Sequence, residues 1–439
     1  MSHVIVVDLG YGDAGKGTVV DWLCSGSAPG GPVHTVVRFN GGAQAAHNVV
    51  TGDGRHHVFA QFGSGTLSAG VRTHLSRHVL VDPLALAAEA GHLEALGVAA
   101  ALDRLTVDRR ALLTTPYHRA ANQARETARG TARHGSCGMG IGETVAYSLA
   151  HDADAPRAGD CACTRTLGRK LTTLRDRLVD ELGPLEAPGV EACTAAFEAF
   201  GARVQMVDET YLPRLLRTHR AVFEGAQGVL LDEWRGFHPY TTWSTTTFAN
   251  AEELLAEAGL AGGATRLGVL RTYATRHGPG PFVTEDPALT AALPDLHNTD
   301  GRWQGAFRVG HFDAVAARYA LEACGGVDGL ALTHLDAASA RRDLQVCGAY
   351  EIGGQRVERI APGGARDLDH QAELTRHLLG ATPVNERVSG SWVDAVARAL
   401  GVPVVLGSWR PTAAGKRLLD DSWCRREGSN LHALSSTGS

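Results

Sequence analysis

Apolar runs of strand length alternate with longer stretches rich in alanine and leucine along most of the chain. The runs that predict strands are Val4–Leu9, Val33–Phe39, Arg220–Phe223, Leu267–Thr272, Gly329–Thr333 and Val402–Leu406. The stretches that predict helices are Leu84–Leu96, Arg119–Arg129, Leu171–Leu182, Val190–Phe200, Ala249–Ala258, Asp313–Ala323 and Gln371–Leu379. Because alternation of this kind favours crossover connections, we expect an α/β fold with a mainly parallel central sheet.

Glycine-rich segments interrupt this pattern, and we expect them to be loops. They are Asn40–His47, Gly135–Gly142, Glu224–Gly228, Arg276–Pro281 and Asp300–Gly310. Loops at the carboxyl ends of parallel strands are where such sheets bind ligands. So many loops of one kind predict a site enclosed by several segments, as an enzyme with more than one substrate needs.

The first predicted strand leads directly into a glycine-rich loop, Gly10–Thr18. Its glycines allow backbone N–H groups to approach phosphate oxygens, and the helix that follows presents its positive N-terminus. Lys16 closes the loop, in a chain that has 42 Lys and Arg residues but uses lysine only here and at Lys170 and Lys416. A compact ammonium fits between phosphate oxygens where a planar guanidinium does not. The segment therefore predicts a P-loop-like nucleotide site.

Two residues of this loop depart from an ordinary P-loop. Gly17 stands where a serine or threonine normally binds Mg²⁺. Asp13 places a carboxylate among the phosphates, which repel it unless it binds a metal or moves a proton. We therefore expect part of the chemistry to reside in the loop itself.

Length and composition limit the class of protein. With 439 residues and no Pro/Ser-rich linker, we expect one large domain over residues 1–417, followed by a frayed tail over residues 418–439. The net charge of -5 gives no footprint for nucleic acid or a membrane surface, and no apolar run is long enough to span a bilayer. The eight cysteines are expected to be reduced thiols, which favours the cytoplasm.

Several separated motifs resemble those of adenylosuccinate synthetase, from about Val4 to about Pro411. The motifs are Gly12–Gly17, Gly41–His47, Gln123–Glu126 with Gly138–Gly142, Phe223–Gly228 with Pro239-Tyr240, Thr275–Phe282 and Thr333–Asp336. That family is homodimeric, uses Mg²⁺, and joins aspartate to inosine monophosphate (IMP) at the expense of GTP, through a 6-phosphoryl intermediate. The resemblance therefore implies a GTP-dependent ligase of purine biosynthesis that forms a C–N bond.

The resemblance also implies roles for individual residues. Asp13 is the implied catalytic base and a ligand of Mg²⁺, together with Ala46, while Lys16 and His47 act on the transferring phosphoryl group. Asp336 resembles the acid that pairs with guanine and rejects adenine. The residues implied in GTP binding are Gly12, Gly15, Lys16, Gly17, Thr18, His334, Asp336 and Ser408.

A second set of residues is implied in binding the other two substrates. The acceptor nucleotide would contact Asp13, Gln44, Cys137, Gln227, Thr242 and Arg302. The carboxylates of the amino acid would contact Arg302 and Arg308.

The motifs depart from the family pattern mainly on this second side. Gln44 replaces an asparagine, and Cys137 replaces a threonine that binds phosphate, although a thiol is a much weaker donor than a hydroxyl. After Gly301 the family has a dense run of arginines, but this chain has only Arg302 and Arg308 there, with Trp303 and Phe307 between them.

Other departures concern the partner subunit and the base of the donor nucleotide. His151 stands near the arginine that reaches the partner subunit's nucleotide in the family, and Arg157 is an alternative donor. His334 replaces a lysine, so preference for GTP over ATP stays open.

Three hypotheses follow from these patterns. The first is a ligase that makes adenylosuccinate from IMP and aspartate. The second is a paralogue that applies the same phosphoryl activation to a different acceptor or amine donor in a specialised pathway. The third is a nucleotide-binding regulator without catalysis, although such a protein has no reason to retain Asp13 and His47 together.

Overall fold

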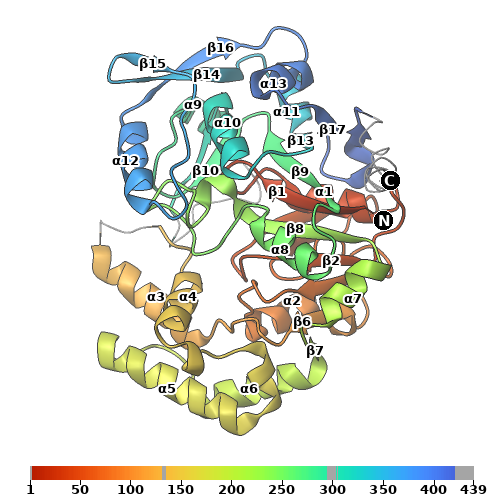
Figure 1. Ribbon diagram of the computed structural model, residues 1–439, viewed down its shortest axis with the longest axis vertical. Helices are drawn as coiled ribbons and strands as arrows, with labels where there is room; N and C mark the ends of the chain where they lie inside the picture. Colours follow the sequence, from red (N-terminus) through yellow and green to blue (C-terminus); the bar gives the residue numbers. More distant parts are fainter. Residues whose placement is uncertain (1, 131–134, 294–302, 304, 421–439) are drawn as a thin grey trace, which may run out of the picture.

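The computed structural model describes residues 2–130, 135–293, 303 and 305–420. A ten-stranded sheet crosses the molecule (Figure 1). In spatial order its strands are β18 (Lys416–Leu418), β17 (Val404–Ser408), β13 (Gly329–Thr333), β9 (Ala264–Arg271), β1 (His3–Asp8), β8 (Ala221–Gly228), β2 (Thr35–Arg38), β5 (Arg72–Leu75), β6 (Leu105–Asp108) and β7 (Gln205–Val207). Neighbouring strands are parallel except for β17 and β18 at one edge. The predicted α/β fold with a mainly parallel sheet is confirmed.

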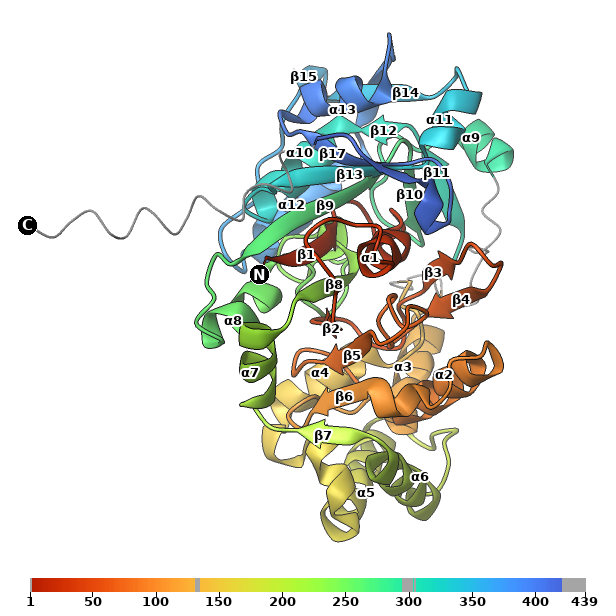
Figure 2. The ribbon, with the colours of Figure 1, turned by 90° about the vertical axis from the view of Figure 1, so that its right-hand side faces the viewer.

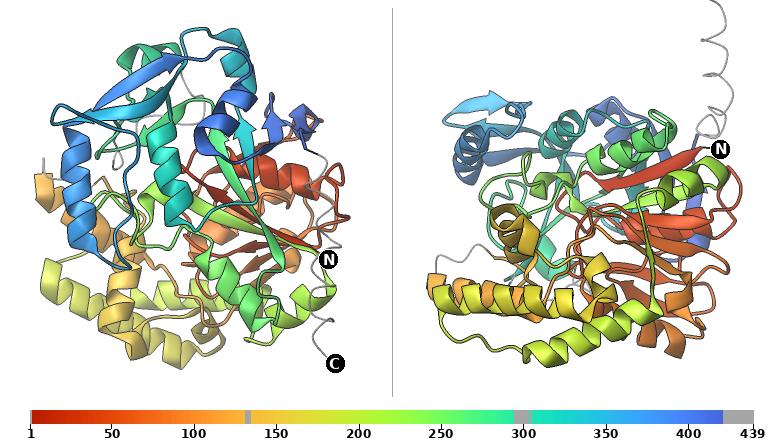
Figure 3. Two further views of the ribbon diagram at one scale, coloured as in Figure 1. Left: turned by 45° about the horizontal axis from the view of Figure 1, so that its top comes forward. Right: turned by 60° about the horizontal axis from the view of Figure 1, so that its bottom comes forward.

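Helices cover this sheet in two groups. The group around the middle and the β17 end of the sheet contains α1 (Lys16–Cys24), α7 (Tyr211–Thr218), α8 (Ala249–Glu257), α9 (Pro287–Ala292), α10 (Ala314–Ala323), α11 (Leu335–Ala340), α12 (Leu368–Leu379) and α13 (Trp392–Leu400). The group at the β7 end contains α2 (Pro83–Ala95), α3 (Pro116–Arg129), α4 (Ile141–Ala150), α5 (Thr164–Leu182) and α6 (Val190–Arg203). Helices α5 and α6 lie side by side along this end of the molecule (Figures 2 and 3).

Strand β1 lies in the interior of the sheet with a hydrophobic core on each face. Ile5 and Val7 belong to the core that contains residues of α7, α8 and α10. Val4 and Val6 belong to the opposite core, with residues of α1. Because both faces are buried, the strand reads as a continuous apolar run rather than as an alternating pattern.

Three smaller sheets complete the fold. They are formed by β3 (His47–Val50) with β4 (His56–Phe59), by β10 (Ala274–His277) with β11 (Phe307–Gly310), and by β12 (Phe312–Asp313), β14 (Gln345–Ile352), β15 (Gln355–Val357) and β16 (Thr382–Arg387). The first two contribute residues to the site described below. The third covers one end of the molecule, above α10 (Figure 1).

The structure contains every predicted strand and helix, with shifted ends; α5, for example, begins at Thr164 rather than at Leu171. One predicted loop is wrong. Residues 224–228 form the second half of β8, because Val6 pairs with Glu224 and Asp8 pairs with Gly228 in the sheet. The expected tail over residues 418–439 lies almost entirely outside the described residues.

Candidate active site

The loop between β1 and α1 folds around a carboxylate that comes from the strand itself. Asp8 is buried, and its Oδ1 accepts hydrogen bonds from the N–H groups of Gly10 (2.7 Å) and Gly12 (3.3 Å). Its Oδ2 accepts from the N–H of Ala14 (2.8 Å) and from Lys16 Nζ (3.2 Å). Gly12 and Gly15 adopt positive φ angles of 122° and 93°, which glycine tolerates without a steric penalty. Asp8 therefore holds the loop Gly10–Thr18, which is predicted to bind phosphate and is called the phosphate loop below, in shape before any ligand arrives.

Asp13 stands at the tip of this loop, where its carboxylate meets a histidine. Its Oδ2 lies 3.4 Å from Nε2 of His277, which comes from β10. Burial raises the pKa of Asp13, although the charges of His277, Arg271 and Lys16 oppose that rise. A carboxylate with a raised pKa is a stronger proton acceptor, which suits a general base.

His47 enters the same cleft from β3 and is held from behind by a buried acid. Its Nδ1 lies 2.6 Å from Oε1 of Glu224, whose Oε2 accepts from the backbone N–H of Ser64 (2.9 Å). The Ser64 hydroxyl donates to Oε1 as well. This arrangement places the imidazole proton on Nδ1 and turns Nε2 toward the cleft.

Burial also determines the ionisation of this pair. It lowers the pKa of His47 to about 4, against the pull of Glu224. Burial alone would favour the neutral acid at Glu224, but His47 and Arg38 outweigh it and bring the pKa of Glu224 down to about 2. At neutral pH the ring is therefore neutral and the acid is ionised.

The missing hydroxyl at Gly17 has a steric explanation. A Cβ atom at Gly17 would come within 2.8 Å of the His47 Cβ and 3.1 Å of the Ser64 hydroxyl. A serine or threonine at position 17 would push His47, which lies on β3, away from the first turn of α1. Glycine at this position therefore lacks the usual P-loop hydroxyl but allows the His47 side chain to approach the loop closely.

Asp13, Gly17 and His47 border one cleft of about 200 Å³ at the ends of the strands. It is lined by the phosphate loop, by β3, and by the segments that follow β9, β13 and β17. All the residues predicted to bind GTP line it, together with Asp13, Ala46 and His47: Gly12, Gly15, Lys16, Gly17, Thr18, His334, Asp336 and Ser408. Sequence motifs more than 300 residues apart thus share one cleft.

At the far end of the cleft, His334 is linked to the phosphate loop by hydrogen bonds. Arg271 Nη2 donates to His334 Nε2 (2.9 Å), which places the ring proton on Nδ1 and directs it to the Thr333 hydroxyl (2.9 Å). That hydroxyl donates in turn to the carbonyl of Ala14 (2.7 Å). Burial and the charge of Arg271 lower the pKa of His334 well below its usual value, so the ring is neutral.

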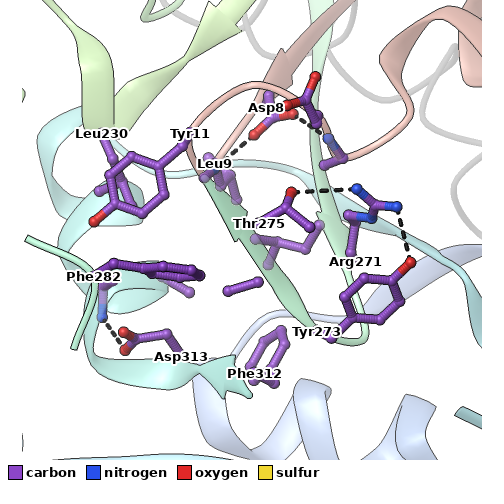
Figure 4. A pocket seen from close by; sticks show the side chains of 17 residues that line it. Asp8, Leu9, Tyr11, Leu230, Arg271, Tyr273, Thr275, Phe282, Phe312 and Asp313 are labelled. Atoms are coloured by element: carbon purple, nitrogen blue, oxygen red, sulfur yellow. Dashed lines mark hydrogen bonds between the residues drawn. The ribbon is translucent and has the colours of Figure 1, made fainter. Parts of the chain in front are cut away.

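A second, mostly apolar cavity of about 50 Å³ lies behind the phosphate loop. Figure 4 shows the rings of Tyr11 and Phe282 facing Arg271 and Tyr273 across it. The Tyr11 hydroxyl donates to the carbonyl of Pro281 (2.9 Å), which anchors the loop to the segment after β10. Arg271 lines both cavities, since it lies between them at the end of β9.

The amide side chains of Gln44 and Gln227 approach the same site from the other side. A Cβ at Gly41 would lie 3.2 Å from Oε1 of Gln227 and 3.6 Å from Nε2 of Gln44. Both amide atoms of Gln44, and Oε1 of Gln227, are buried without a hydrogen-bond partner among the described residues. Gln227 also adopts a positive φ of 55°, unusual for a residue with a side chain. Buried, unpaired amides of this kind favour a ligand that supplies the missing partners.

The remaining predicted residues lie in different settings. Cys137 has a free thiol whose pKa is raised by burial, so it is protonated at neutral pH. Thr242 is positioned by its backbone N–H, which donates to the Leu231 carbonyl (2.8 Å). Arg302 lies outside the described residues.

Arg308 is bonded largely within the protein. It donates to the carboxylate of Glu285 (2.7 Å) and to the carbonyls of Gly278 (2.6 Å) and Gly280 (3.2 Å). Its guanidinium also lies over the ring of Phe282. Arg308 thus holds the 278–280 turn in place beside Asp13 and His277.

Comparison with known proteins shows the family and the fold of this chain. The sequence model of the adenylosuccinate synthetase family matches residues 5–389. The chain belongs to the adenylosuccinate synthetase family. Its structure is similar to that of fully ligated adenylosuccinate synthetase from Plasmodium falciparum, with a TM-score of 0.82 at 21% identity over 96% of this chain and 100% of that one.

A second similar structure is the succinoaminodeoxyadenylate synthetase of cyanophage S-2L, solved with dGMP and with dATP as an energy donor. Here the TM-score is 0.60 at 19% identity, over 95% of each chain. At such identities the likeness concerns the fold. Membership in the adenylosuccinate synthetase family makes the protein an enzyme of the GTP-dependent ligase type.

The predicted Mg²⁺ site of this family member can be tested against its donor set. The Asp13 carboxylate and the segment of Ala46 border the same cleft as the phosphate loop. Mg²⁺ takes one or two carboxylates and completes its octahedron with water and substrate phosphates. The described residues contain no group of three or more His, Cys, Asp or Glu able to hold a metal by themselves. The oxygen donors at Asp13 and Ala46 therefore fit a metal that arrives with a nucleotide.

Two residues of the site were not predicted from sequence: Asp8, which organises the phosphate loop, and Glu224, which orients His47. Both are charged residues inside otherwise apolar strands, and that contrast is the signal that marks them. His277, the neighbour of Asp13, lies in the motif Thr275–Phe282, but the sequence alone indicated no role for it.

Among the described residues, no helix is both long enough and apolar enough to cross a membrane.

Proposed function

We propose that the protein joins an amino acid to a 6-oxopurine nucleotide at the expense of GTP, with IMP and L-aspartate as substrates and adenylosuccinate as product. The observation that carries this proposal is the placement of Asp13 and His47 in one cleft with the phosphate loop. An ordinary nucleotide-hydrolysing site has no need of a carboxylate with a raised pKa at the tip of that loop.

In the first step Asp13 accepts the N1 proton of the acceptor base, and the negative charge moves to O6. This oxygen attacks the γ-phosphorus of GTP, the bond from that phosphorus to the β-bridging oxygen breaks, and GDP leaves. Lys16, the loop N–H groups and the His47 Nε2 edge surround the transferring group. The negative charge on the transferring phosphoryl group favours protonation of His47. Glu224 then stabilises the resulting imidazolium.

Mg²⁺ held by Asp13 and the Ala46 carbonyl would neutralise charge on the phosphates when bound. In the second step the amino group of aspartate attacks C6 and gives up one proton, and inorganic phosphate leaves with the former O6 and carries that proton away. The amide groups of Gln44 and Gln227 are the candidates to bind the acceptor, with Cys137 and Thr242 contributing to the same substrate. Arg302 and Arg308 are the candidates for the aspartate carboxylates.

A second candidate function is the same activation chemistry with a different acceptor or amine donor. It is favoured by the internal bonding of Arg308, which leaves less of its guanidinium for a substrate carboxylate. The thiol of Cys137 favours it too, since it is a weak donor to phosphate. We further propose, from the family, a cytoplasmic homodimer.

The test is an assay of purified protein with GTP, Mg²⁺, IMP and aspartate, in which product absorbance and released phosphate are followed together. We expect one phosphate for each adenylosuccinate formed and no release when IMP is omitted. If neither signal appears, a mass-spectrometric screen that varies acceptor and amine donor separately decides between the second candidate and a non-catalytic nucleotide binder. The absence of turnover with every pair would exclude both ligase functions.

A further inference from the structure

The three lysines of the chain occupy three different settings. Lys16 belongs to the phosphate loop. Lys170, on α5, donates to the carbonyl of Ala155 (3.0 Å) and to the carboxylate of Asp160 (2.8 Å). No residue of α5 lines the cleft, and α5 lies at the end of the molecule opposite β17 (Figure 1). Lys416, on the edge strand β18, is buried and lies beyond the residues that the family model matches. No role assigned so far involves it.

The ammonium group of Lys416 gathers three consecutive backbone carbonyls. Nζ donates to the oxygens of Arg410 (3.0 Å), Pro411 (2.8 Å) and Thr412 (2.9 Å). It also contacts the hydroxyl of Thr18, which is itself bonded to the Pro411 carbonyl. Lys416 therefore joins the segment after β17 to the first turn of α1.

Both of the segments that Lys416 joins are walls of the cleft. Arg410, Pro411 and Ser408 line it at the end where Asp336 and His334 lie, and Thr18 lines it beside the phosphate loop. The segment 410–412 has no regular secondary structure, and its carbonyls also accept from the Ser408 hydroxyl (3.4 Å), the Thr18 hydroxyl and the N–H of Gly415 (3.0 Å). Lys416 bonds to all three carbonyls and to Thr18, so this buried cation ties the two walls of the cleft together.

We propose that Lys416 is a positioning residue for the donor nucleotide, fastening the wall at the base end of the cleft to the helix that follows the phosphate loop. This inference rests on the proposed function only in requiring that the cleft bind a purine nucleoside triphosphate. Lys416 does not touch the reacting atoms, so it contributes to donor affinity and not to the chemical step.

The chemistry of the site explains why an ammonium is needed. Three carbonyls and a hydroxyl around one nitrogen match the compact, rotatable donors of lysine and not the planar fork of arginine. Burial lowers the pKa of Lys416 to about 8, opposed by the charges of Asp21 on α1 and Asp336 on α11. The titratable group that also responds to this ammonium is His334, whose pKa is lowered by burial, by Arg271 and by Lys416. Neutral Lys416 has fewer protons to donate, so the link between the segment 410–412 and α1 weakens as pH rises through this value.

The test compares Lys416→Met with Lys170→Met, which removes a lysine that is bonded in a similar way elsewhere. We measure the dissociation constant of a GTP analogue with a fluorescent ribose label, without acceptor or amino acid. Lys416→Met should weaken binding about tenfold, and the steady-state KM for GTP should rise in proportion while kcat at saturating GTP stays within about twofold. Lys170→Met should leave the dissociation constant within about twofold of the unchanged protein.

A rescue experiment excludes a merely structural role. Methylammonium or ethylammonium should restore most of the lost affinity to Lys416→Ala, and neither should improve Lys170→Ala. Between about pH 7 and 8.5, where the guanine base keeps its N1 proton, the unchanged protein should lose affinity more steeply than Lys416→Met. Equal affinity in Lys416→Met, or failure of both amines to restore affinity to Lys416→Ala, would overturn the inference alone. If the unchanged protein binds no purine nucleoside triphosphate, the proposed function fails and the inference fails with it.

Discussion

The phosphate-loop cleft and the neighbouring region of Gln44 and Gln227, which we propose as the donor side and the acceptor side of the site, are built in opposite ways. On the proposed donor side the charged groups already have protein partners: Asp8 binds the phosphate loop, and Glu224 binds His47 and Ser64. On the proposed acceptor side both amide atoms of Gln44 and Oε1 of Gln227 are buried without such partners among the described residues. The first arrangement is preorganised for a charge that develops during reaction, and the second awaits a ligand.

The difference indicates which side can vary without loss of the chemistry. Groups that stabilise a phosphoryl transfer state must stand in place beforehand, so each depends on a buried partner and tolerates little change. Groups that bind a substrate by neutral hydrogen bonds contribute individually, so one can be exchanged at modest cost. Departures from the family pattern concentrate at Gln44, Cys137 and Trp303, on the side that awaits a ligand.

The largest effect is expected from Asp13→Asn. The amide cannot accept a proton, so kcat should fall by about 10³ to 10⁴, near the upper limit for loss of a general base. Affinity for the fluorescent GTP analogue should change little in the absence of Mg²⁺, because the loop N–H groups and Lys16 remain. Turnover at the level of the unchanged protein would refute the role of Asp13 as the base.

Acid should destabilise the protein through histidines that burial keeps neutral. Burial lowers the pKa of His47 and of His74 to about 4, and that of His118 to about 3, from an ordinary value of 6.5. Between pH 6.5 and 4 the unfolded chain binds protons at these rings and the folded protein does not. Stability is therefore complete above pH 6.5 and falls by about 1.4 kcal/mol per pH unit for each ring as the pH decreases.

Between pH 6.5 and 6 the three rings together give about 4 kcal/mol per pH unit, against a total stability of about 5–15 kcal/mol. Below pH 6 the carboxyls of Asp21 and Asp313 oppose them, because burial raises the pKa of each to about 6 and the folded protein binds those protons first, so the slope becomes shallower. Urea unfolding in steps from pH 7.5 to 5 measures the slope. His118→Asn is the control, because its side-chain oxygen can still accept from the N–H of Thr115, as His118 Nδ1 does at 3.1 Å, while one titrating ring is lost. A slope that stays the same in this variant, or the absence of any slope, would contradict the expectation.

Gln227→Leu tests the acceptor side. The KM for the acceptor should rise about tenfold, while the KM for GTP should not change, because one hydrogen bond to the ligand is lost. Without ligand the melting temperature should stay the same or rise, since an unpaired buried amide has been removed.

The matched change on the donor side is Glu224→Gln, and it should behave differently. The Glu224 carboxylate accepts from His47 and from the backbone N–H and hydroxyl of Ser64, and an amide cannot accept from all of them, which costs about 1–3 kcal/mol of stability. If both variants lose stability equally, the contrast between the two sides of the cleft is wrong.

The smallest effect is expected from Cys137→Thr. A hydroxyl is a better donor than a thiol, so the KM for a nucleoside monophosphate acceptor should fall about threefold if the acceptor carries a phosphate at this position. The corresponding nucleoside, measured in parallel, should show no improvement. An unchanged KM for both would favour an acceptor that lacks the phosphate.

The sequence predicted those parts of the fold in which each residue's neighbours along the chain determine its conformation. Strand β1, its glycine loop and helix α1 are such a unit, and the structure contains them. Strands β5, β6 and β7 were not predicted, because each has only three or four residues and a mixture of polar and apolar side chains. They are strands because the sheet already provides a neighbour for each.

The same distinction holds in the site. The residues of the phosphate loop are adjacent in sequence, so their spacing alone indicated the chemistry. The bond between His47 and Glu224 joins residues 177 positions apart. No local pattern encodes it, and residues 224–228 looked like a glycine-rich turn until the pairing of β8 with β1 was known.

The position of β1 inside the sheet has a consequence for the synthesis of the protein on the ribosome. The neighbours of this first strand are β8 and β9, which begin at Ala221 and Ala264. Roughly half of the chain must therefore leave the ribosome before β1 gains its first neighbour. Until then its apolar residues and unpaired backbone are available to chaperones or to other nascent chains. The segment that identifies the enzyme is translated first but becomes a functional loop late.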